Sequence, residues 1–371
     1  MARIFQDGFE MGVPSGNGTT AFGAFRGLWQ FDQTSVATFA GSTIGVVSNI
    51  KNSGVYSLRH YSGGSSNSRQ SKIWRSLGAN LAEHYGRVEI RVVDINAATC
   101  GIVHVRDENF DTVADIRLTG TGDVKLYIDN TEVASISSYL QFGQFVRLEW
   151  CLVVDEENGK FEVRADGNSL LSWEGNTNPH NTGAIRFLCL GYAVLTGSSN
   201  VFYFDDVAVN DTTGTINNSW CGNGSILLLK PKDNGHYSQF TGNVPADDNW
   251  EHVNEIPHDG DTTYVESEDD GDIDTYVMEK LIADHGIDSA SVVKAVQVCF
   301  TGRHEGSDAN LAPMLRSGTS DEEGDTLYLS SSYHRLFHQI FNVNPFTTNQ
   351  WTLTDVDTLE AGVKHKEHQY G

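Results

Sequence analysis

Two adjacent carboxylates, Asp205 and Asp206, follow an apolar, aromatic stretch in NVFYFDDVAVND, residues 200–211. Paired carboxylates can cleave a glycosidic bond, bind calcium, or form the polar end of a strand. Cleavage needs two carboxyl groups facing one sugar, about 5 Å or more apart. Neighbouring residues of a strand point to opposite faces, so this pair cannot share one substrate. We therefore expect a structural role for the pair, with a calcium site as the alternative.

The alternation along the same stretch predicts which way each carboxylate faces. Phe202 and Phe204 share one face, which we assign to the core, and Tyr203 takes the other. By this alternation Asp206 lies on the core side and Asp205 faces outward. A buried carboxylate needs hydrogen-bond donors. We expect these donors to be backbone N–H groups of a neighbouring turn, with a bound cation as the second choice.

A second acidic region spans residues 255–274, EIPHDGDTTYVESEDDGDID, with nine carboxylates and neither Lys nor Arg. Calcium binds several carboxylate and carbonyl oxygens, but the ligand order of an EF-hand is missing here. A solvated acidic loop is the expected structure. The sequence thus requires no cofactor, and calcium is the one ion that stays open.

The sequence holds no recognisable nucleophile or zinc site. His334 and His338 have i, i+4 spacing, but they lie in a strand-like context without two further ligands. The cysteines are odd in number, widely spaced and mostly flanked by apolar residues, which predicts free, buried thiols. They are Cys100, Cys151, Cys189, Cys221 and Cys299.

Tryptophans beside turn residues are the candidates for contact with a sugar or a partner protein. Aromatic rings at turns stack on sugars or anchor interfaces, although they also close the ends of β-sandwiches. Both interpretations are kept for Trp173, Trp220, Trp250 and Trp351.

Composition excludes several classes of partner. The chain of 371 residues carries 49 acidic and 25 basic residues, a formal net charge of −24. This field repels nucleic acid and disfavours an anionic membrane surface. No run approaches the roughly 20 apolar residues of a membrane span. The N-terminal stretch lacks a secretory signal, and with the unpaired cysteines this predicts folding in a reducing cytosol.

Period-two alternation predicts an all-β chain. Residues 145–154, FVRLEWCLVV, read as a strand, and residues 123–136 and 159–173 read as hairpins that turn at Asp129–Asn130 and Asp166–Gly167. The polar, Gly- and Asn-rich residues 212–224 predict a linker. We expect a first domain at 1–212 and a C-terminal β-sandwich domain at 213–371, the latter with a short helix near 276–284 and one capped at Thr354.

Several stretches together resemble a known family. FQDGFEMG at 5–12, SGVYSLRHY at 53–61 and FYFDDVAVN at 202–210 resemble a concanavalin A-like (laminin G-like) jelly roll of tailed-bacteriophage virion proteins. GSILLLKPKDNG at 224–235 and VKAVQVCFTGR at 293–303 are similar to the second β domain that accompanies it. The resemblance implies two β-sandwich domains.

The resemblance also implies a function. It points to a non-enzymatic structural component of the virion, in the head surface, tail or baseplate, assembled in the host cytoplasm with other virion proteins and as a homo-oligomer. Glycoside hydrolases of this fold carry E-x-D-x-x-E on one strand, and that spacing is missing here. We therefore expect no enzyme activity. The alternative is a carbohydrate-binding or receptor-binding protein that contacts a glycan on the host surface.

Overall fold

The computed structural model describes residues 2–12, 28–31, 43–62, 72–96, 99–192, 200–244, 247–305, 309–331 and 336–367. The chain forms two compact units. Unit 1 comprises Met1–Glu10 with Trp29–Leu227, and unit 2 comprises Met11–Leu28 with Leu228–Gly371. Both are built almost entirely from antiparallel strands, which confirms the predicted all-β fold class.

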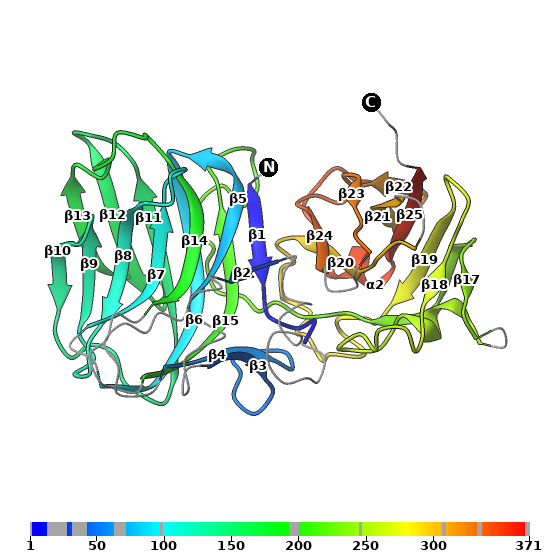
Figure 1. Cartoon of the computed structure of the whole chain (residues 1–371), viewed down its shortest axis with the longest axis horizontal. Coiled ribbons are helices and arrows are strands. Elements are labelled where there is room, and N and C mark those ends of the chain that lie inside the picture. Colours follow the sequence, from blue (N-terminus) through cyan, green and yellow to red (C-terminus); the bar gives the residue numbers. More distant parts are fainter. Residues whose placement is uncertain are drawn as a thin grey trace. The chain divides into compact units, whose positions relative to one another are not determined.

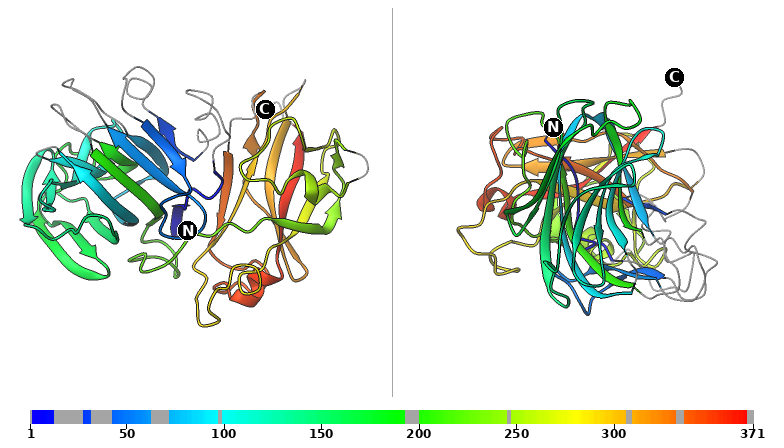
Figure 2. Two further views of the ribbon diagram at one scale, coloured as in Figure 1. Left: turned by 90° about the horizontal axis from the view of Figure 1, so that it is seen from below. Right: turned by 90° about the vertical axis from the view of Figure 1, so that its left-hand side faces the viewer.

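Unit 1 is a sandwich of two sheets, seen as two layers of strands in Figures 1 and 2. We call one of them the first sheet. Seven of its strands form a continuous order, and an eighth, β1 (Arg3–Asp7), pairs with β15 beside that order. The order of the seven strands is β13 (Asn168–Gly175), β12 (Gly159–Ala165), β11 (Phe145–Val153), β6 (Glu83–Ile95), β15 (Asn200–Asn210), β4 (Ser57–Ser62) and β3 (Thr43–Val47).

The second sheet covers the apolar face of the first. Its order is β10 (Thr131–Ile136), β9 (Val124–Ile128), β8 (Thr112–Leu118), β7 (Cys100–Arg106), β14 (Ile185–Tyr192), β5 (Ile73–Leu81) and β2 (Gln30–Phe31). The hairpin turns predicted at Asp129–Asn130 and Asp166–Gly167 join β9 to β10 and β12 to β13, and all four residues have positive φ.

Large aromatic side chains fill the space between the two sheets. Trp150, Phe161, Phe202 and Phe204 are at most 1 % exposed. Burial of each such side chain stabilises the fold by roughly 1.5–3 kcal/mol. The indole Nε1–H of Trp150 donates to Nε2 of His84 over 3.0 Å, so the polar atom of the ring is also satisfied.

Unit 2 has one large antiparallel sheet and two small ones. The large sheet follows β16 (Pro231–Ser238), β19 (Ile273–Met278), β25 (Glu360–Glu367), β21 (Ala309–Ser317) and β22 (Ser320–Glu323), and β23 (Leu327–Tyr328) also pairs with β21. The small sheets are β17 (Thr241–Gly242) with β18 (Val265–Glu266), and β20 (Val296–Thr301) with β24 (Leu336–Phe341). A 3₁₀ turn, η3, spans Asn249–His252, and α2 spans Leu353–Asp357.

The core of unit 2 joins the small sheet β20–β24 to the large sheet and to α2. Its buried members are Val298, Leu315, Phe341, Trp351, Val356 and Leu359. Trp351 Nε1–H donates to the carbonyl oxygen of Phe341 over 2.8 Å.

The two predicted helices of this region differ from the structure. Residues 276–278 end strand β19, and the turns that follow hold no helix among the described residues. Helix α2 begins after Thr352 instead of Thr354. The Thr352 hydroxyl accepts from the Asp355 N–H, and the Asp355 carboxylate accepts from the Thr352 N–H. This reciprocal cap is the stronger N-terminal signal. No helix in the described ranges is long and apolar enough to cross a membrane.

The division between the units also lies later than the predicted 212/213. Residues 213–227 pack with unit 1, because this polar stretch runs back along the first sheet. The Sγ of Cys221 lies 3.7 Å from the carbonyl oxygen of Ala208, and the Ile226 N–H donates to Asp206 over 2.6 Å. Glycine and asparagine there shape a docked loop and not a linker.

Gly86→Ala tests how tightly the core of unit 1 is packed. A Cβ atom at Gly86 would overlap the indole ring of Trp150. We expect the substitution to lower the free energy of unfolding by about 1–3 kcal/mol, the usual penalty of overpacking. Gly45→Ala is the matched control, because a Cβ at this strand glycine meets nothing within 4 Å. Equal denaturant midpoints for the two variants would contradict the packing described here.

Candidate functional site

The second sheet of unit 1 turns one face to the core and presents polar and aromatic side chains on the other. Val103, Val105, Ile116, Leu126 and Leu188 alternate with the outer residues and are at most 2 % exposed. Cross-strand register places Tyr127 opposite Asp115, Asp115 opposite His104, His104 opposite Cys189, and Cys189 opposite Trp74. Adjacent positions add four more residues to this face. We call the set the polar face: Trp74, His104, Arg106, Asp115, Arg117, Lys125, Tyr127, Phe187 and Cys189.

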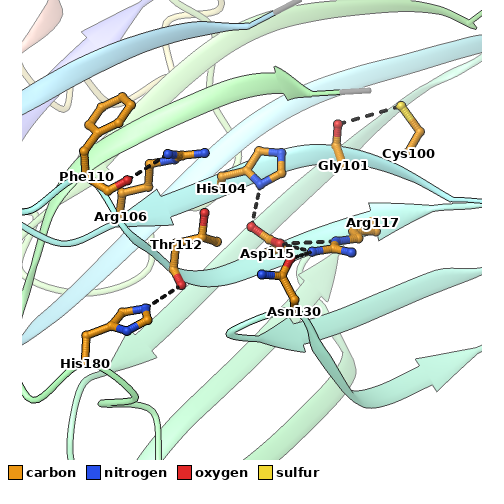
Figure 3. A network of polar contacts seen from close by, with 10 residues as sticks. All are labelled: Cys100, Gly101, His104, Arg106, Phe110, Thr112, Asp115, Arg117, Asn130 and His180. Carbon is orange, nitrogen blue, oxygen red and sulfur yellow. Dashed lines mark hydrogen bonds and ion pairs between the residues drawn. The ribbon is translucent and has the colours of Figure 1, made fainter. Parts of the chain in front are cut away.

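A histidine and an aspartate meet at the centre of the polar face, as Figure 3 shows. Nδ1 of His104 lies 2.5 Å from Oδ1 of Asp115. The other carboxylate oxygen accepts from Arg117, at 2.5 Å from Nη2 and 3.2 Å from Nε. Burial alone would raise the pKa of Asp115, but His104 and Arg117 together hold this pKa below its usual value.

This arrangement fixes the histidine ring. A carboxylate on Nδ1 sets the orientation and tautomer of an imidazole and leaves Nε2 as the nitrogen that can exchange a proton. Both side chains are about 2 % exposed, so the pair is sheltered from bulk water. A histidine held in this way can act as a general acid or base. Its contact with Asp115 also joins β7 to β8.

Cationic and aromatic groups surround the pair. The guanidinium of Arg106 lies over the ring of Phe110 at 4.7 Å and donates to its carbonyl oxygen. The rings of Trp74, Phe110 and Phe187 contact each other edge-on, with centroids 5.0 to 5.5 Å apart. Aromatic planes and guanidinium groups side by side suit a ligand that has both sugar rings and negative charge.

The far end of the polar face carries a second group of contacts. Arg117 lies over the ring of Tyr127 at 4.0 Å and donates to Asn130. Lys125 Nζ and the Tyr127 hydroxyl both donate to Glu132 in β10. Burial and this hydrogen bond raise the pKa of Tyr127. Tyr127 is therefore a neutral donor at ordinary pH.

Sequence reasoning did not identify His104, Asp115 or Arg117. The signal was available in HVRDENFDTVADIRL, residues 104–118, where polar residues alternate with aliphatic ones on both arms of a hairpin. Polar residues opposite each other on two neighbouring strands indicate a shared face, but only the register shows which ones meet.

The structure places both Asp205 and Asp206 in the interior, each 0 % exposed. Asp205 pairs with Glu89 in β6, so it lies on the predicted face, away from the core and beside Tyr203, but the turn at residues 51–56 covers it. The register between β15 and β6 shifts between Asp205 and Ala208, and Asp206 has φ of +49°. A β-bulge of this kind breaks the alternation beyond Asp205, so Asp206 contacts the same turn instead of taking the predicted core side.

The donors to the pair come from one neighbouring turn, as predicted, and from the loop after β15. Asp205 accepts the backbone N–H groups of Asn52 and Ser53, at 2.8 and 3.2 Å. Asp206 accepts the side chains of the same two residues and the Ile226 N–H. Glu10 accepts from the N–H groups of Val55 and Tyr56. Three carboxylates therefore hold the turn at residues 51–56.

Burial of these carboxylates changes their protonation. Burial, and then the neighbouring Asp206, raises the pKa of Asp205 to about 8. Burial also raises the pKa of Glu10 to about 7. Among the described residues no three His, Cys, Asp or Glu side chains are arranged to hold a metal ion. Calcium at Asp205 and Asp206 stays the alternative to the predicted structural role, and a chelator tests it.

The acidic run at 255–274 ends in a buried carboxylate instead of a solvated one. Asp274 is 0 % exposed and accepts from the Phe240 N–H, the Asn249 side chain and the Tyr276 hydroxyl. This residue therefore has a structural role within unit 2.

The four candidate tryptophans do not form one surface. Trp351 is 2 % exposed in the core of unit 2, which removes it from the candidates for sugar stacking. Trp220 lies under the guanidinium of Arg164 at 3.7 Å. Trp173 is half-buried in the edge strand β13, and Trp250 is half-buried in η3.

None of the five cysteines is in a disulfide, as predicted; four are buried and Cys299 is half-buried. Burial raises the pKa of Cys100 to about 12 and that of Cys189 to about 11. These two thiols are therefore protonated and have no nucleophilic role, although Cys189 lies on the polar face.

No protein-family model and no curated protein matches this chain. Solved structures are similar in fold. The cellulose-induced protein Cip1 is 16% identical, with 59% of this chain and 100% of Cip1 covered and a TM-score of 0.43. An endo-β-1,4-glucuronan lyase from the fungus Trichoderma reesei is 13% identical, covering 56% of this chain and 95% of the lyase, with a TM-score of 0.41. The GH16 endo-β-1,3(4)-glucanase SCLam is 11% identical, covering 56% and 90%, with a TM-score of 0.38.

These comparisons correct one expectation. We expected no enzyme, because E-x-D-x-x-E and other catalytic motifs are missing from the sequence. Structures of similar fold include polysaccharide lyases and a glucanase, so the missing motif was no ground for that conclusion. A motif excludes one mechanism only, and function depends on the site and not on the fold. The similarity assigns neither a superfamily nor a reaction to this chain, whose layered all-β fold follows from its own strands.

The buried carboxylates predict an unusual pH dependence of unfolding. Their folded pKa values lie above those of the unfolded chain, so their stabilising contribution is lost as pH rises through the folded values. We expect the melting midpoint of unit 1 to rise when pH falls from about 8.5 to about 6.5. His84, whose pKa burial lowers to about 3, acts in the opposite sense only below about 6.5.

Asp205→Asn keeps the shape of the side chain and removes its titration. The melting midpoint of this variant should depend less on pH across the same window. An unchanged slope would contradict the assignment to Asp205. Repeating the melts with a chelator tests calcium separately, since a lower midpoint with chelator alone would identify a bound ion.

Proposed function

We propose that the polar face of unit 1 binds an acidic polysaccharide. The main support for this proposal is the strip of cationic and aromatic side chains on this face, with Arg106, Arg117 and Lys125. The chain as a whole has a net charge of −24. A polyanion approaching this protein is repelled at long range. A binding site for it must therefore concentrate positive charge locally, as this strip does.

Arg106 is the residue best placed to contact a carboxylate. It is half-buried, donates to the carbonyl oxygen of Phe110, and has no acidic partner within the described ranges. Arg117 and Lys125 already contact Asp115 and Glu132, which partly offset their charge. The edge-on rings of Trp74 and Phe187 lie beside Arg106 and supply an apolar surface for a sugar ring.

A second candidate function is cleavage of the bound polysaccharide by elimination. A base removes the proton beside the uronate carboxylate, the glycosidic C–O bond breaks, and a double bond forms in the ring. The leaving oxygen then takes up a proton. The contact between His104 and Asp115 favours this candidate, because it supplies a positioned base. Arg106 would balance the charge that develops on the carboxylate.

The biological setting is proposed from the sequence resemblance alone. The stretches at 5–12, 53–61 and 202–210 support a place in a tailed-phage particle, assembled in the host cytoplasm beside other virion proteins and as a homo-oligomer. A glycan of the host surface is then the expected ligand. Mass spectrometry of purified particles tests this, and a chain missing from the particle contradicts it.

Arg106→Gln tests glycan binding. We expect the affinity for a polyuronate oligomer to fall about tenfold, since a charge-assisted hydrogen bond contributes about 1.5–3 kcal/mol. Titration calorimetry at two salt concentrations measures the effect. Lys232→Gln, an exposed lysine of unit 2, removes the same charge and should leave the affinity unchanged. Equal losses in both variants would mean that only net charge matters.

Cleavage is tested separately from binding. Wild-type protein incubated with polyuronates should generate unsaturated ends that absorb in the ultraviolet, and His104→Gln should abolish them. Asp115→Asn should reduce the rate strongly, because the ring loses its orienting carboxylate. Binding without any unsaturated product would reject the elimination and leave the binding proposal intact.

A further inference from the structure

A row of charged and aromatic residues crosses the outer face of the first sheet, on the side of unit 1 opposite to the polar face. Tyr203 in β15 pairs with Arg59 in β4 on one side and with Arg91 in β6 on the other. Alternation puts all three on the face away from the core, because Phe202 and Phe204 point inward with 0 % exposure. Two arginines thus flank one tyrosine.

These two arginines differ from the others of the same sheet face. Arg147 contacts Glu149 at 3.2 Å, and Arg164 contacts Glu162 at 2.9 Å. Within the described ranges neither Arg59 nor Arg91 has an ion pair or a hydrogen bond, and the Nε of each is buried without a partner. The guanidinium of Arg59 makes a cation–π contact with the ring of Tyr61, at 5.3 Å from the ring centroid.

The neighbouring carboxylates do not neutralise the row. Asp205 directs its oxygens to the N–H groups of Asn52, Ser53 and Asp206. Glu89 lies two residues from Arg91 on β6, and no ion pair joins them. Arg87, on the same strand as Arg91, also has no ion pair, but it donates to the carbonyl oxygens of Asp206 and Gly222. Within the described ranges Arg59 and Arg91 have no such acceptor.

We propose that Arg59 and Arg91 form a second binding site for an acidic glycan, one that takes two anionic groups of the same chain. The arginines stand two strands apart, so their backbones are about 10 Å apart. A ligand with repeated negative charges can therefore place one on the terminal Nη groups of each guanidinium. The half-buried ring of Tyr61 supplies apolar surface for a sugar, and the buried ring of Tyr203 separates the two arginines.

A glycan fits this row better than an acidic protein segment does. The row runs across the strands of the first sheet, and the backbone groups of these strands are already used within the sheet. An added peptide strand would need a free sheet edge for its hydrogen bonds. A sugar chain needs only side-chain donors and aromatic planes, which this row offers.

The side-chain Nε–H signals of the two arginines provide a direct test. In ¹⁵N-resolved NMR spectra, addition of a uronate hexamer should shift the Nε–H signals of Arg59 and Arg91. Arg59→Gln and Arg91→Gln should each weaken the binding measured at the remaining arginine by about tenfold. Lys160→Gln is the control, because this lysine lies on the same sheet face and has its own partner, Glu162. It should change the affinity less than twofold.

Three outcomes would overturn the proposal. The first is the same loss of affinity with Lys160→Gln, since the general charge of the face would then explain binding. The second is no shift of either Nε–H signal at millimolar hexamer. The third is a polyglutamate peptide that binds this row as tightly as the hexamer, which would indicate a protein partner. Repeating the titration in Arg106→Gln keeps this site distinct from the polar face, because the Arg59 and Arg91 shifts should persist.

Discussion

Every long strand of unit 1 must turn its apolar side chains toward the space between the two sheets, and the rest of the structure follows from this constraint. Trp150, Phe161, Phe202 and Phe204 occupy that space. Since strand residues alternate, each apolar residue inside places its neighbours outside. The outer faces of the sandwich therefore collect the histidine, tyrosine, arginine and carboxylate side chains of strands that are remote in sequence. Both proposed binding sites are consequences of how the core is filled.

The two outer faces use their charges differently. On the second sheet a carboxylate, Asp115, is shared between His104 and Arg117, so positive charge is positioned but partly balanced. On the first sheet two arginines are balanced by a glutamate of the same strand, Arg147 by Glu149 and Arg164 by Glu162. Arg59 and Arg91 stand outside this pattern. In a protein with so many acidic residues, arginines that lack a carboxylate indicate positions where an anion from outside can bind.

Local patterns in the sequence predicted the strands and hairpin turns well, because alternation and positive-φ residues act over a few neighbours. The strand at 145–154 and the turns at Asp129–Asn130 and Asp166–Gly167 needed nothing else. The predicted direction of Asp206 failed, since the bulge after Asp205 breaks the alternation. The His104–Asp115 contact was missed for a different reason. It depends on the register between two strands. The hydrophobic pattern shows which face of the sheet a residue lies on, but not which residue of the neighbouring strand it meets.

The relation between His104 and the solvent separates the two activities considered for the polar face. Binding requires only the half-buried groups, of which Arg106 and Arg117 reach the surface. Proton transfer requires that a substrate reach His104, which is 2 % exposed. The same carboxylate that would activate the histidine also joins two strands through it, so Asp115 is strongly held whichever activity applies. A buried ion network of this kind is weak evidence of stability by itself, because desolvation offsets much of its attraction. Its position among cationic and aromatic groups on an outer face is what distinguishes it from the internal pair of Trp150 and His84.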